Sequence, residues 1–263
     1  MASSEERMIN LPGVITALLG VMIAIECFAA TAPRGLVYSF FEALAFIPLR
    51  FSLLLAPQSV LAALNQGAAL DLSGQEQLAA TLNAGPAVYF TPLTYAFLHG
   101  GWTHLTINGL TFAAFGAPVA RRLGAALFLL FFACCAVAGA MTHLALHPLD
   151  VAPVVGASAA ISGTMAAVVR FAFSPGARLG EDGRGRKART TSLRRLGENR
   201  QAVIFLVVWF AANALLGAFP AASGSSEAIA WEAHMGGFLF GLVTFGAFDY
   251  QARRWGAESE RAG

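Results

Sequence analysis

A serine, two histidines and an asparagine lie in apolar stretches of the chain, and their chemical types fit acyl transfer. The stretches are PVVGASAAISG with Ser158, HGGWTHLTINGL with His104 and Asn108, and WEAHMGGFLFG with His234. A serine hydroxyl becomes an effective nucleophile when a neighbouring imidazole accepts its proton, which Ser158 and His234 could do together. N–H groups of His104 and Asn108 and the backbone N–H of Ser158 could hold a tetrahedral oxyanion.

The composition indicates that these residues lie in a membrane. Of 263 residues, 57% are apolar and 12% are charged, and the mean hydropathy is +0.62. Soluble domains carry about 25% charged residues. The three cysteines all fall in apolar runs, so they do not indicate a disulfide framework. Polar residues inside membrane spans are costly, and we therefore treat them as functional candidates.

The elements that must position the polar residues are helices of about 20 apolar residues. The sequence predicts six spans, at 11–32, 101–120, 124–146, 153–173, 201–219 and 229–249. Between the first two, the connection 33–100 contains an apolar part broken by Pro48 and Arg50. For this part we expect a membrane-associated outer loop rather than a seventh span. The predicted fold is an all-α bundle of six helices, divided into an N-terminal tail (1–10), a membrane domain (11–250) and a C-terminal tail (251–263).

The cations predict the orientation of this bundle. With six spans, all Lys and Arg except Arg34 and Arg50 fall on one side, which the positive-inside rule identifies as cytoplasmic. Both tails are then cytoplasmic. The basic loop 174–200 could instead bind nucleic acid or lipid, but a topology signal explains it more simply, and we expect no nucleic acid partner. The alanine-rich composition and the lack of a presequence favour a bacterial inner membrane.

The orientation brings the polar residues to one depth. His104 and Asn108 are four residues apart on one face of the second span, and Ser158 and His234 each lie about five residues into the fourth and sixth spans. At 1.5 Å per residue, all four lie roughly 6–10 Å below the outer surface. A shared site would explain this agreement. Gly156 would let the chain turn closely into the helix that begins near Ser158.

At these residues the sequence resembles the rhomboid family of intramembrane serine proteases, over about 90–250. The resemblance implies a six-helix core and a Ser–His dyad of Ser158 and His234, with His104 and Asn108 stabilising the oxyanion. It further implies no metal and no cofactor, and substrates that are single-span membrane proteins cut near the outer end of their helix. Membrane lipid is the other expected partner, and the oligomeric state is not predicted.

The resemblance also implies close packing of the sixth span on the fourth. Gly237 and Gly241 match the family's packing glycines, and the small stripe on the fourth span, which includes Gly163, would receive them. In one departure from the family pattern, Ala159 stands where a glycine is usual. In another, Ser162 stands where an aromatic residue is frequent, so no ring there can stack on His234.

Several alternatives remain open at this point. Ser158 could be a helix N-cap residue, and His234 could be an interfacial histidine. The protein could be an inert rhomboid-like binder of membrane clients or, as a distant third hypothesis, a small transporter. We interpret His143 and His147 as interfacial residues, and we give Glu26 in the first span no catalytic role. The connection 218–228 is either a lid or a plain surface turn.

Overall fold

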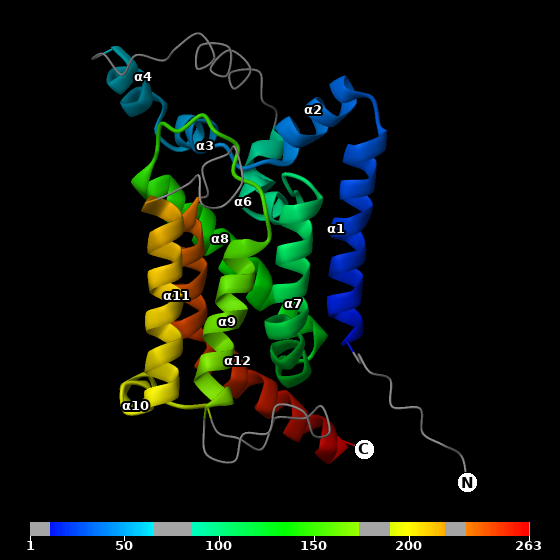
Figure 1. Ribbon diagram of the computed structural model, residues 1–263, viewed down its shortest axis with the longest axis vertical. Coiled ribbons are helices and arrows are strands. Elements are labelled where there is room, and N and C mark those ends of the chain that lie inside the picture. Colours follow the sequence, from blue (N-terminus) through cyan, green and yellow to red (C-terminus); the bar gives the residue numbers. More distant parts are fainter. Residues whose placement is uncertain (1–10, 66–85, 174–189, 219–229, 263) are drawn as a thin grey trace.

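The structure, a computed structural model, describes residues 11–65, 86–173, 190–218 and 230–262. In these ranges the elements are helices, and the β-type pairing is a single isolated bridge between Phe46 and Val154. The predicted all-α fold class is therefore confirmed (Figure 1). The lid hypothesis for 218–228 and most of the basic loop 174–200 fall on residues outside these ranges.

Each predicted apolar span coincides with a helix. These helices are α1 (Gly13–Thr31), α7 (Trp102–Leu123), α8 (Ala125–Leu146), α9 (Ser158–Ala172), α11 (Arg200–Ala218) and α12 (Trp231–Ala262). Figure 1 shows them running along the long axis of the molecule. The two largest differences from the predicted boundaries are that α9 begins only at Ser158 and that α12 remains helical through most of the predicted C-terminal tail.

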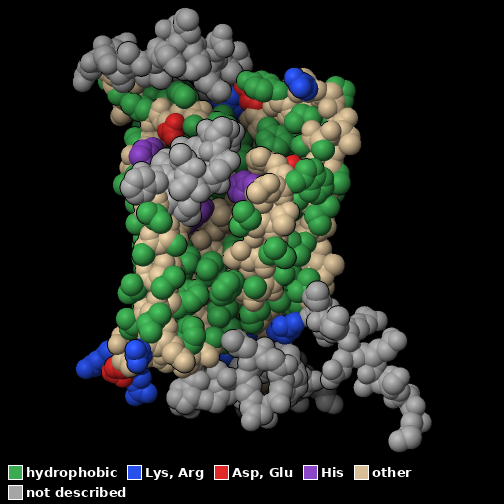
Figure 2. All heavy atoms as spheres, in the orientation of Figure 1, with side chains coloured by type: hydrophobic (Ala, Val, Ile, Leu, Met, Phe, Trp, Pro, Cys, Tyr) green, Lys and Arg blue, Asp and Glu red, His purple; other side chains and the backbone are tan. Residues whose placement is uncertain are grey.

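The helices have the surface that lipid requires. By length and composition alone, α1 and α8 could each cross a membrane, whereas α9 and the Arg200–Leu215 part of α11 are apolar but shorter. Large apolar side chains point outward along the bundle, and Leu110, Val208 and Val243 are each more than half exposed. Figure 2 shows this apolar surface over the middle of one face, with Lys and Arg side chains gathered mainly at the lower end. Such extended apolar exposure is unfavourable in water and favourable in a bilayer.

The connection between α1 and α7 folds into short helices at the upper end of the bundle. They are α2 (Arg34–Leu44), α3 (Pro48–Leu55), α4 (Pro57–Asn65), the 3₁₀-helix η1 (Pro86–Phe90), α6 (Thr91–Thr94) and the 3₁₀-helix η2 (Tyr95–Phe97). Pro48 begins α3, a position where its missing N–H breaks no helical hydrogen bond. Arg50 is buried in an ion pair with Glu42 of α2, so the arginine that interrupts the apolar run is neutralised locally.

α9 lies at the centre of the bundle. Most of its residues are buried, and it packs against α7, α8 and α12. A central helix needs small side chains if three neighbours are to approach it closely, and its sequence SAAISGTMAAVV supplies them. The end of the helix that carries Ser158 is therefore held in place from several sides.

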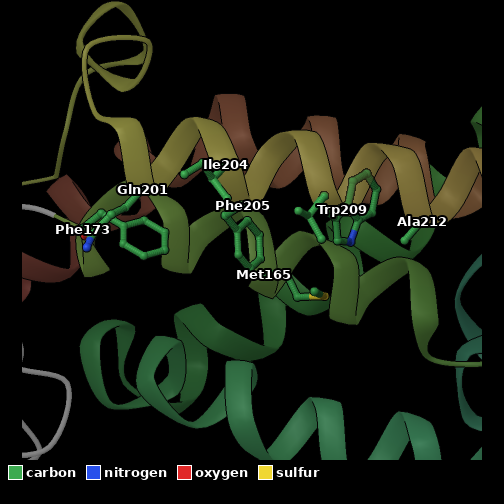
Figure 3. Close-up of a pocket in the computed structure, with 8 residues that line it drawn as sticks. Met165, Phe173, Gln201, Ile204, Phe205, Trp209 and Ala212 are labelled. Atoms are coloured by element: carbon green, nitrogen blue, oxygen red, sulfur yellow. The ribbon is translucent and has the colours of Figure 1, made fainter.

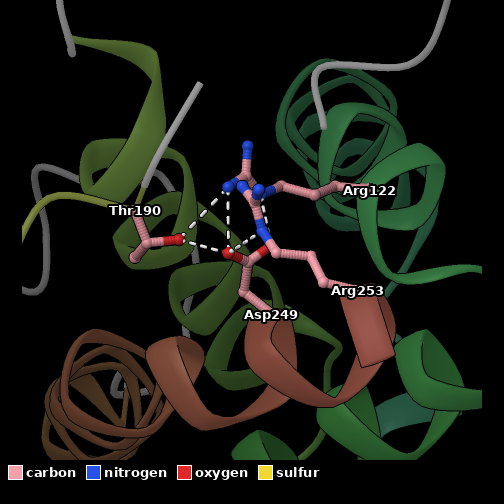
Figure 4. Close-up of polar contacts among 4 residues, drawn as sticks. All are labelled: Arg122, Thr190, Asp249 and Arg253. Atoms are coloured by element: carbon pink, nitrogen blue, oxygen red, sulfur yellow. Dashed lines mark hydrogen bonds and ion pairs between the residues drawn. The ribbon is translucent and has the colours of Figure 1, made fainter. Parts of the chain in front are cut away.

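The opposite end of the bundle is held by a buried ion pair between α7 and α12 (Figure 4). Arg122 donates two hydrogen bonds to Asp249, of 2.7 and 3.0 Å, and their side chains are 1% and 5% exposed. Thr190 and Arg253 also donate to Asp249. The positive-inside pattern identifies Arg122 only as a topology signal. In the structure, Arg122 also connects α7 with α12, which are distant in sequence.

Replacing Asp249 with asparagine is expected to lower the free energy of unfolding by about 3 kcal/mol, because the buried guanidinium of Arg122 would lose its counter-charge. Thermal unfolding of the purified variant and wild type in one detergent measures the difference. The matched control is Glu258→Gln, which breaks an exposed pair with Arg254 on the same helix and should change stability little. Equal destabilisation by both substitutions would contradict this role for Asp249.

Candidate active site

His104 and Asn108 lie in the first two turns of α7 and face the segment that leads into α9. The backbone N–H of Gly100 donates to Nδ1 of His104 at 3.3 Å, so the proton of a neutral ring resides on Nε2. A β-carbon placed on Gly156 would lie 2.9 Å from His104 Nε2 and 3.5 Å from Asn108 Nδ2. Both side-chain nitrogens therefore lie against Gly156, two residues before Ser158.

The segment that leads into α9 is fixed by the outer connection. Val154 exchanges both backbone hydrogen bonds with Phe46, and the N–H of Gly156 donates to the Tyr95 carbonyl at 3.0 Å. Gly156 has a φ of +118°, which disfavours any residue with a β-carbon. A side chain at this position would also meet the ring of His104. Glycine is therefore required here for both conformation and space.

Ser158 is the first residue of α9. The cap position before it is Ala157, and no side chain caps this helix end, so the alternative that Ser158 is the N-cap residue is wrong. Helix geometry leaves the first backbone N–H groups without intrahelical acceptors and gives this end a partial positive charge. The backbone at Ser158 is therefore well suited to an anion beside Gly156.

The sixth predicted span packs on α9 without intervening side chains. A β-carbon on Gly237 would lie 2.1 Å from the Ala159 carbonyl oxygen, and one on Gly241 would lie 2.5 Å from that of Gly163. This backbone contact leaves no room for a methyl group on either glycine of α12. His234 lies about one turn before Gly237, and the packing places its turn beside the start of α9.

Ala159, the departure from the family pattern, is accommodated by the neighbouring helix α8. A β-carbon on Gly139 would lie only 2.5 Å from the β-carbon of Ala159. The glycine at 139 thus supplies the space that the extra methyl occupies. Ser162, one turn deeper on α9, is 5% exposed and is buried where α9 packs against its neighbouring helices.

His234 is held by Asn213, which is not among the predicted site residues. Nδ1 of His234 lies 2.9 Å from Oδ1 of Asn213 on α11, and Nδ2 of Asn213 donates to the Trp209 carbonyl at 2.9 Å. Because the Trp209 carbonyl only accepts, the amide nitrogen must face it, and Oδ1 must accept from His234 Nδ1–H. Nε2 of the imidazole is then the nitrogen that can accept a proton.

The signal for Asn213 was present in the sequence. It is a polar residue within the predicted fifth span, and its side chain is buried. One turn before Asn213 on α11, the ring of Trp209 stacks on the ring of Phe238, with 3.8 Å between the centroids. Phe238 follows His234 by one turn of α12. Asn213 therefore holds the His234 ring from α11, whereas Ser162 provides no aromatic contact to it.

The predicted partners Ser158 and His234 are not hydrogen-bonded to each other. Among the described residues, no hydrogen bond joins Ser158 and His234. Catalytic hydrogen bonds are often long in a protein without substrate and shorten when it binds. An electrostatic interaction connects His104 with His234, so the two histidines share one environment.

His99 supports the site from the connection before α7. Its side chain is 2% exposed, and its ring lies 5.1 Å from that of His104, between centroids. Burial, with a smaller effect of the nearby His104, lowers the pKa of His99 to about 4. His99 is therefore neutral at pH 7 and adds no charge beside His104.

Comparison with known protein families finds a match. The family model described as Rhomboid domain matches residues 87–249, which span α7 to most of α12 and all the site residues named above. No curated protein matches the chain closely enough to count as a relative. Together with its apolar helices, the match identifies an integral membrane protein.

Proposed function

This chain belongs to the rhomboid family, and we propose that it is an intramembrane serine endopeptidase that cuts single-span membrane proteins near the outer end of their helix. The observation that carries the proposal is the convergence of His104 Nε2 and Asn108 Nδ2 on Gly156, next to the first residue of α9. Asn108 is 7% exposed, and its Nδ2 is a buried donor without a hydrogen-bond partner among the residues that the structure describes. Such a donor is costly unless an acceptor arrives during function.

The proposed reaction begins with attack of Ser158 Oγ on the carbonyl carbon of the scissile peptide bond. His234 Nε2 accepts the hydroxyl proton, and Asn213 keeps the other ring proton on Nδ1. The tetrahedral oxyanion accepts hydrogen bonds from His104, Asn108 and the backbone N–H of Ser158. When the C–N bond breaks, the proton on Nε2 passes to the leaving amine. Water then attacks the acyl-enzyme by the same proton route and releases the second product.

The second candidate is an inert rhomboid-like protein that binds membrane clients. Such a protein needs neither a nucleophile nor a base. Here Ser158 begins the central helix at its positive end, and His234 is oriented by the hydrogen bond that it donates to Asn213 on another helix. A protein that only binds clients would gain nothing from this orientation, so the peptidase is the better proposal.

An apolar groove between α9 and α11 supports a substrate that is itself a helix. The groove has a volume of about 580 Å³, and its lining includes Met165, Phe205, Val208 and Trp209. Figure 3 shows Met165 of α9 and Phe205 and Trp209 of α11 projecting into the space between the two helices. We propose that α11 borders the path by which a substrate helix enters sideways. Trp209 lies both in this lining and beside the residue that holds His234.

The proposed setting is the bacterial inner membrane, with both tails and the basic loop on the cytoplasmic side. Figure 1 shows the start of α1, α10 (Leu193–Leu196) and the end of α12 at one end of the bundle, opposite the short helices α2, α3 and α4. This arrangement supports the orientation that the cations predict.

The function is tested with purified protein in detergent and a labelled single-span substrate. Under the proposal, mass spectrometry finds two new products whose shared boundary lies near the outer end of the substrate helix. Recovery of intact substrate bound to the protein, with no product from any of a panel of single-span proteins, would favour the inert alternative.

Asn213→Leu is expected to lower kcat about 30-fold while KM changes less than about 3-fold, because the imidazole loses the acceptor that orients it but the groove keeps its shape. Asn213→Asp retains an acceptor for Nδ1–H and should keep more activity than Asn213→Leu. Steady-state cleavage kinetics measure both variants.

The control for Asn213 is Asn199→Ala, on the same helix. Asn199 Oδ1 accepts from the N–H groups of Gln201 and Ala202 and so caps the far end of α11. Its loss should reduce stability by about 1 kcal/mol and leave kcat nearly unchanged. If both variants lose stability and kcat in parallel, Asn213 only supports the helix and does not position His234.

A further inference from the structure

Three side chains that could bind a metal meet at the outer end of the bundle, outside the proposed active site. His143 and His147 are four residues apart at the end of α8, and Glu232 is in the first turn of α12. One candidate ligand atom from each residue lies within 4.8 Å of the other two. His147 Nε2 is 2.9 Å from Glu232 Oε1, and His143 Nδ1 is 3.4 Å from Glu232 Oε2.

The packing of α8 on α12 builds this cluster. A β-carbon on Gly236 would lie 2.2 Å from Oγ1 of Thr142, so the two helices touch at this point. Glu232 precedes Gly236 by one turn, and His143 directly follows Thr142. The spacing of His143 and His147 puts both rings on one face of their helix. The same glycine contact that joins the helices therefore brings the carboxylate to the two imidazoles.

The surroundings of the His143 side chain are a second feature of this cluster. This side chain is 7% exposed, and neither ring nitrogen makes a short hydrogen bond to another described residue. Its two nitrogens face carboxylates instead: Glu232 on the Nδ1 side at 3.4 Å and Asp150 on the Nε2 side at 3.6 Å. A buried imidazole with a carboxylate on each side is held in the orientation that a metal ligand needs.

The spacing fits an ion between the ligands. In a tetrahedral zinc site with ligands at about 2.0–2.1 Å, neighbouring ligand atoms are about 3.4 Å apart. The distance between His143 Nδ1 and Glu232 Oε2 equals this separation, and a bound ion would replace the 2.9 Å hydrogen bond between His147 Nε2 and Glu232 Oε1. Two imidazoles and one carboxylate suit zinc, whereas magnesium and calcium prefer oxygen ligands only.

We propose that His143, His147 and Glu232 bind a zinc ion. His143 coordinates through Nδ1 and donates its Nε2–H to Asp150, which fixes the ring in the manner of carboxylate–histidine–zinc groups. His147 is 46% exposed, so the fourth position is open to water at the outer surface. The ion joins the end of α8 to the first turn of α12, two residues before His234. This site is independent of the proposed peptidase activity.

The test uses the full chain, purified without a polyhistidine tag, stripped with a chelator and dialysed against zinc. We expect about one zinc per chain by atomic emission, with no competition from excess magnesium or calcium. Zinc at about 100 times its Kd should raise the unfolding temperature by about 5 °C. Cobalt in place of zinc should give visible absorption bands typical of a four-coordinate ion.

Substitution of a proposed zinc ligand tests where the ion binds. His147→Gln changes the most exposed ligand, and it should weaken zinc binding at least about 10-fold while keeping the unfolding temperature measured in chelator. The matched control, Glu258→Gln, alters an exposed carboxylate on the same helix and should bind zinc as the wild type does. Less than about 0.1 zinc per chain, equal binding by His147→Gln and wild type, or binding that is lost only in His234→Ala would each overturn the proposal.

Discussion

Replacing Ser158 with alanine is expected to abolish cleavage, with a fall in kcat of roughly 10⁴-fold or more. In the proposed mechanism the substitution removes the oxygen that attacks the peptide bond, while Ala at the first position of a helix preserves α9. Substrate binding depends on apolar surfaces away from this oxygen, so affinity should change little. Initial rates of cleavage and a binding assay with the labelled substrate separate the two effects.

The matched control for this result is Ser162→Ala, one turn deeper on the same helix. Ser162 is buried in the packed interior of α9 and needs no reactive role there. It should cleave at a rate close to that of the wild type. If Ser162→Ala abolishes activity and Ser158→Ala does not, the nucleophile lies one helical turn from where we place it.

Replacing His234 with alanine is the second large expected effect, a fall in kcat of roughly 10³–10⁴-fold. Without the imidazole, Ser158 has no base for its proton and the leaving amine has no acid. The hydrogen bond to Asn213 is lost as well, so a small decrease in stability is also expected. Cleavage kinetics and thermal unfolding of the same preparation measure both quantities.

Met235→Leu serves as the control for His234, because it changes a neighbouring side chain of α12 at nearly constant volume. It should retain both cleavage and stability. The double variant Ser158→Ala, His234→Ala should be no slower than either single variant, because the two residues act as one unit. Multiplicative losses would show that His234 acts on another group.

Much of the fold follows from simple features of the sequence. Long apolar runs predict helices because a backbone in lipid must satisfy its own hydrogen bonds. Helices α7 and α8 begin within one residue of the predicted spans. The start of α9 could not be read this way, since residues 153–157 are as apolar as the helix that follows. There the bridge between Phe46 and Val154 and the positive φ of Gly156 hold the chain out of the helix.

The sequence identifies candidate site residues where polar side chains occur together in apolar runs. Ser158, His104, Asn108 and His234 each stand out as polar residues in apolar runs. What the sequence does not show is which residues meet in space. Glu232 reaches His147 across 85 positions of sequence through the contact of two helices.

The sequence alone also does not show where a residue on one helix is accommodated by a residue on another. Ala159 is acceptable because Gly139 on another helix makes room for its methyl group. Arg122 turns inward to Asp249 instead of remaining a free cation at the membrane surface. Both outcomes depend on the register between helices, which a single sequence with its periodicity does not determine.

The central claim is that Ser158 and His234 form one reactive pair at the outer end of α9, and active-site labelling with a fluorophosphonate tests it most directly. The account predicts a single covalent adduct, located on Ser158 by peptide mass spectrometry. The adduct should be absent from Ser158→Ala, form at least about 100-fold more slowly in His234→Ala, and form normally in Ser162→Ala. An adduct that persists in Ser158→Ala, or that forms at the wild-type rate without His234, would contradict the account.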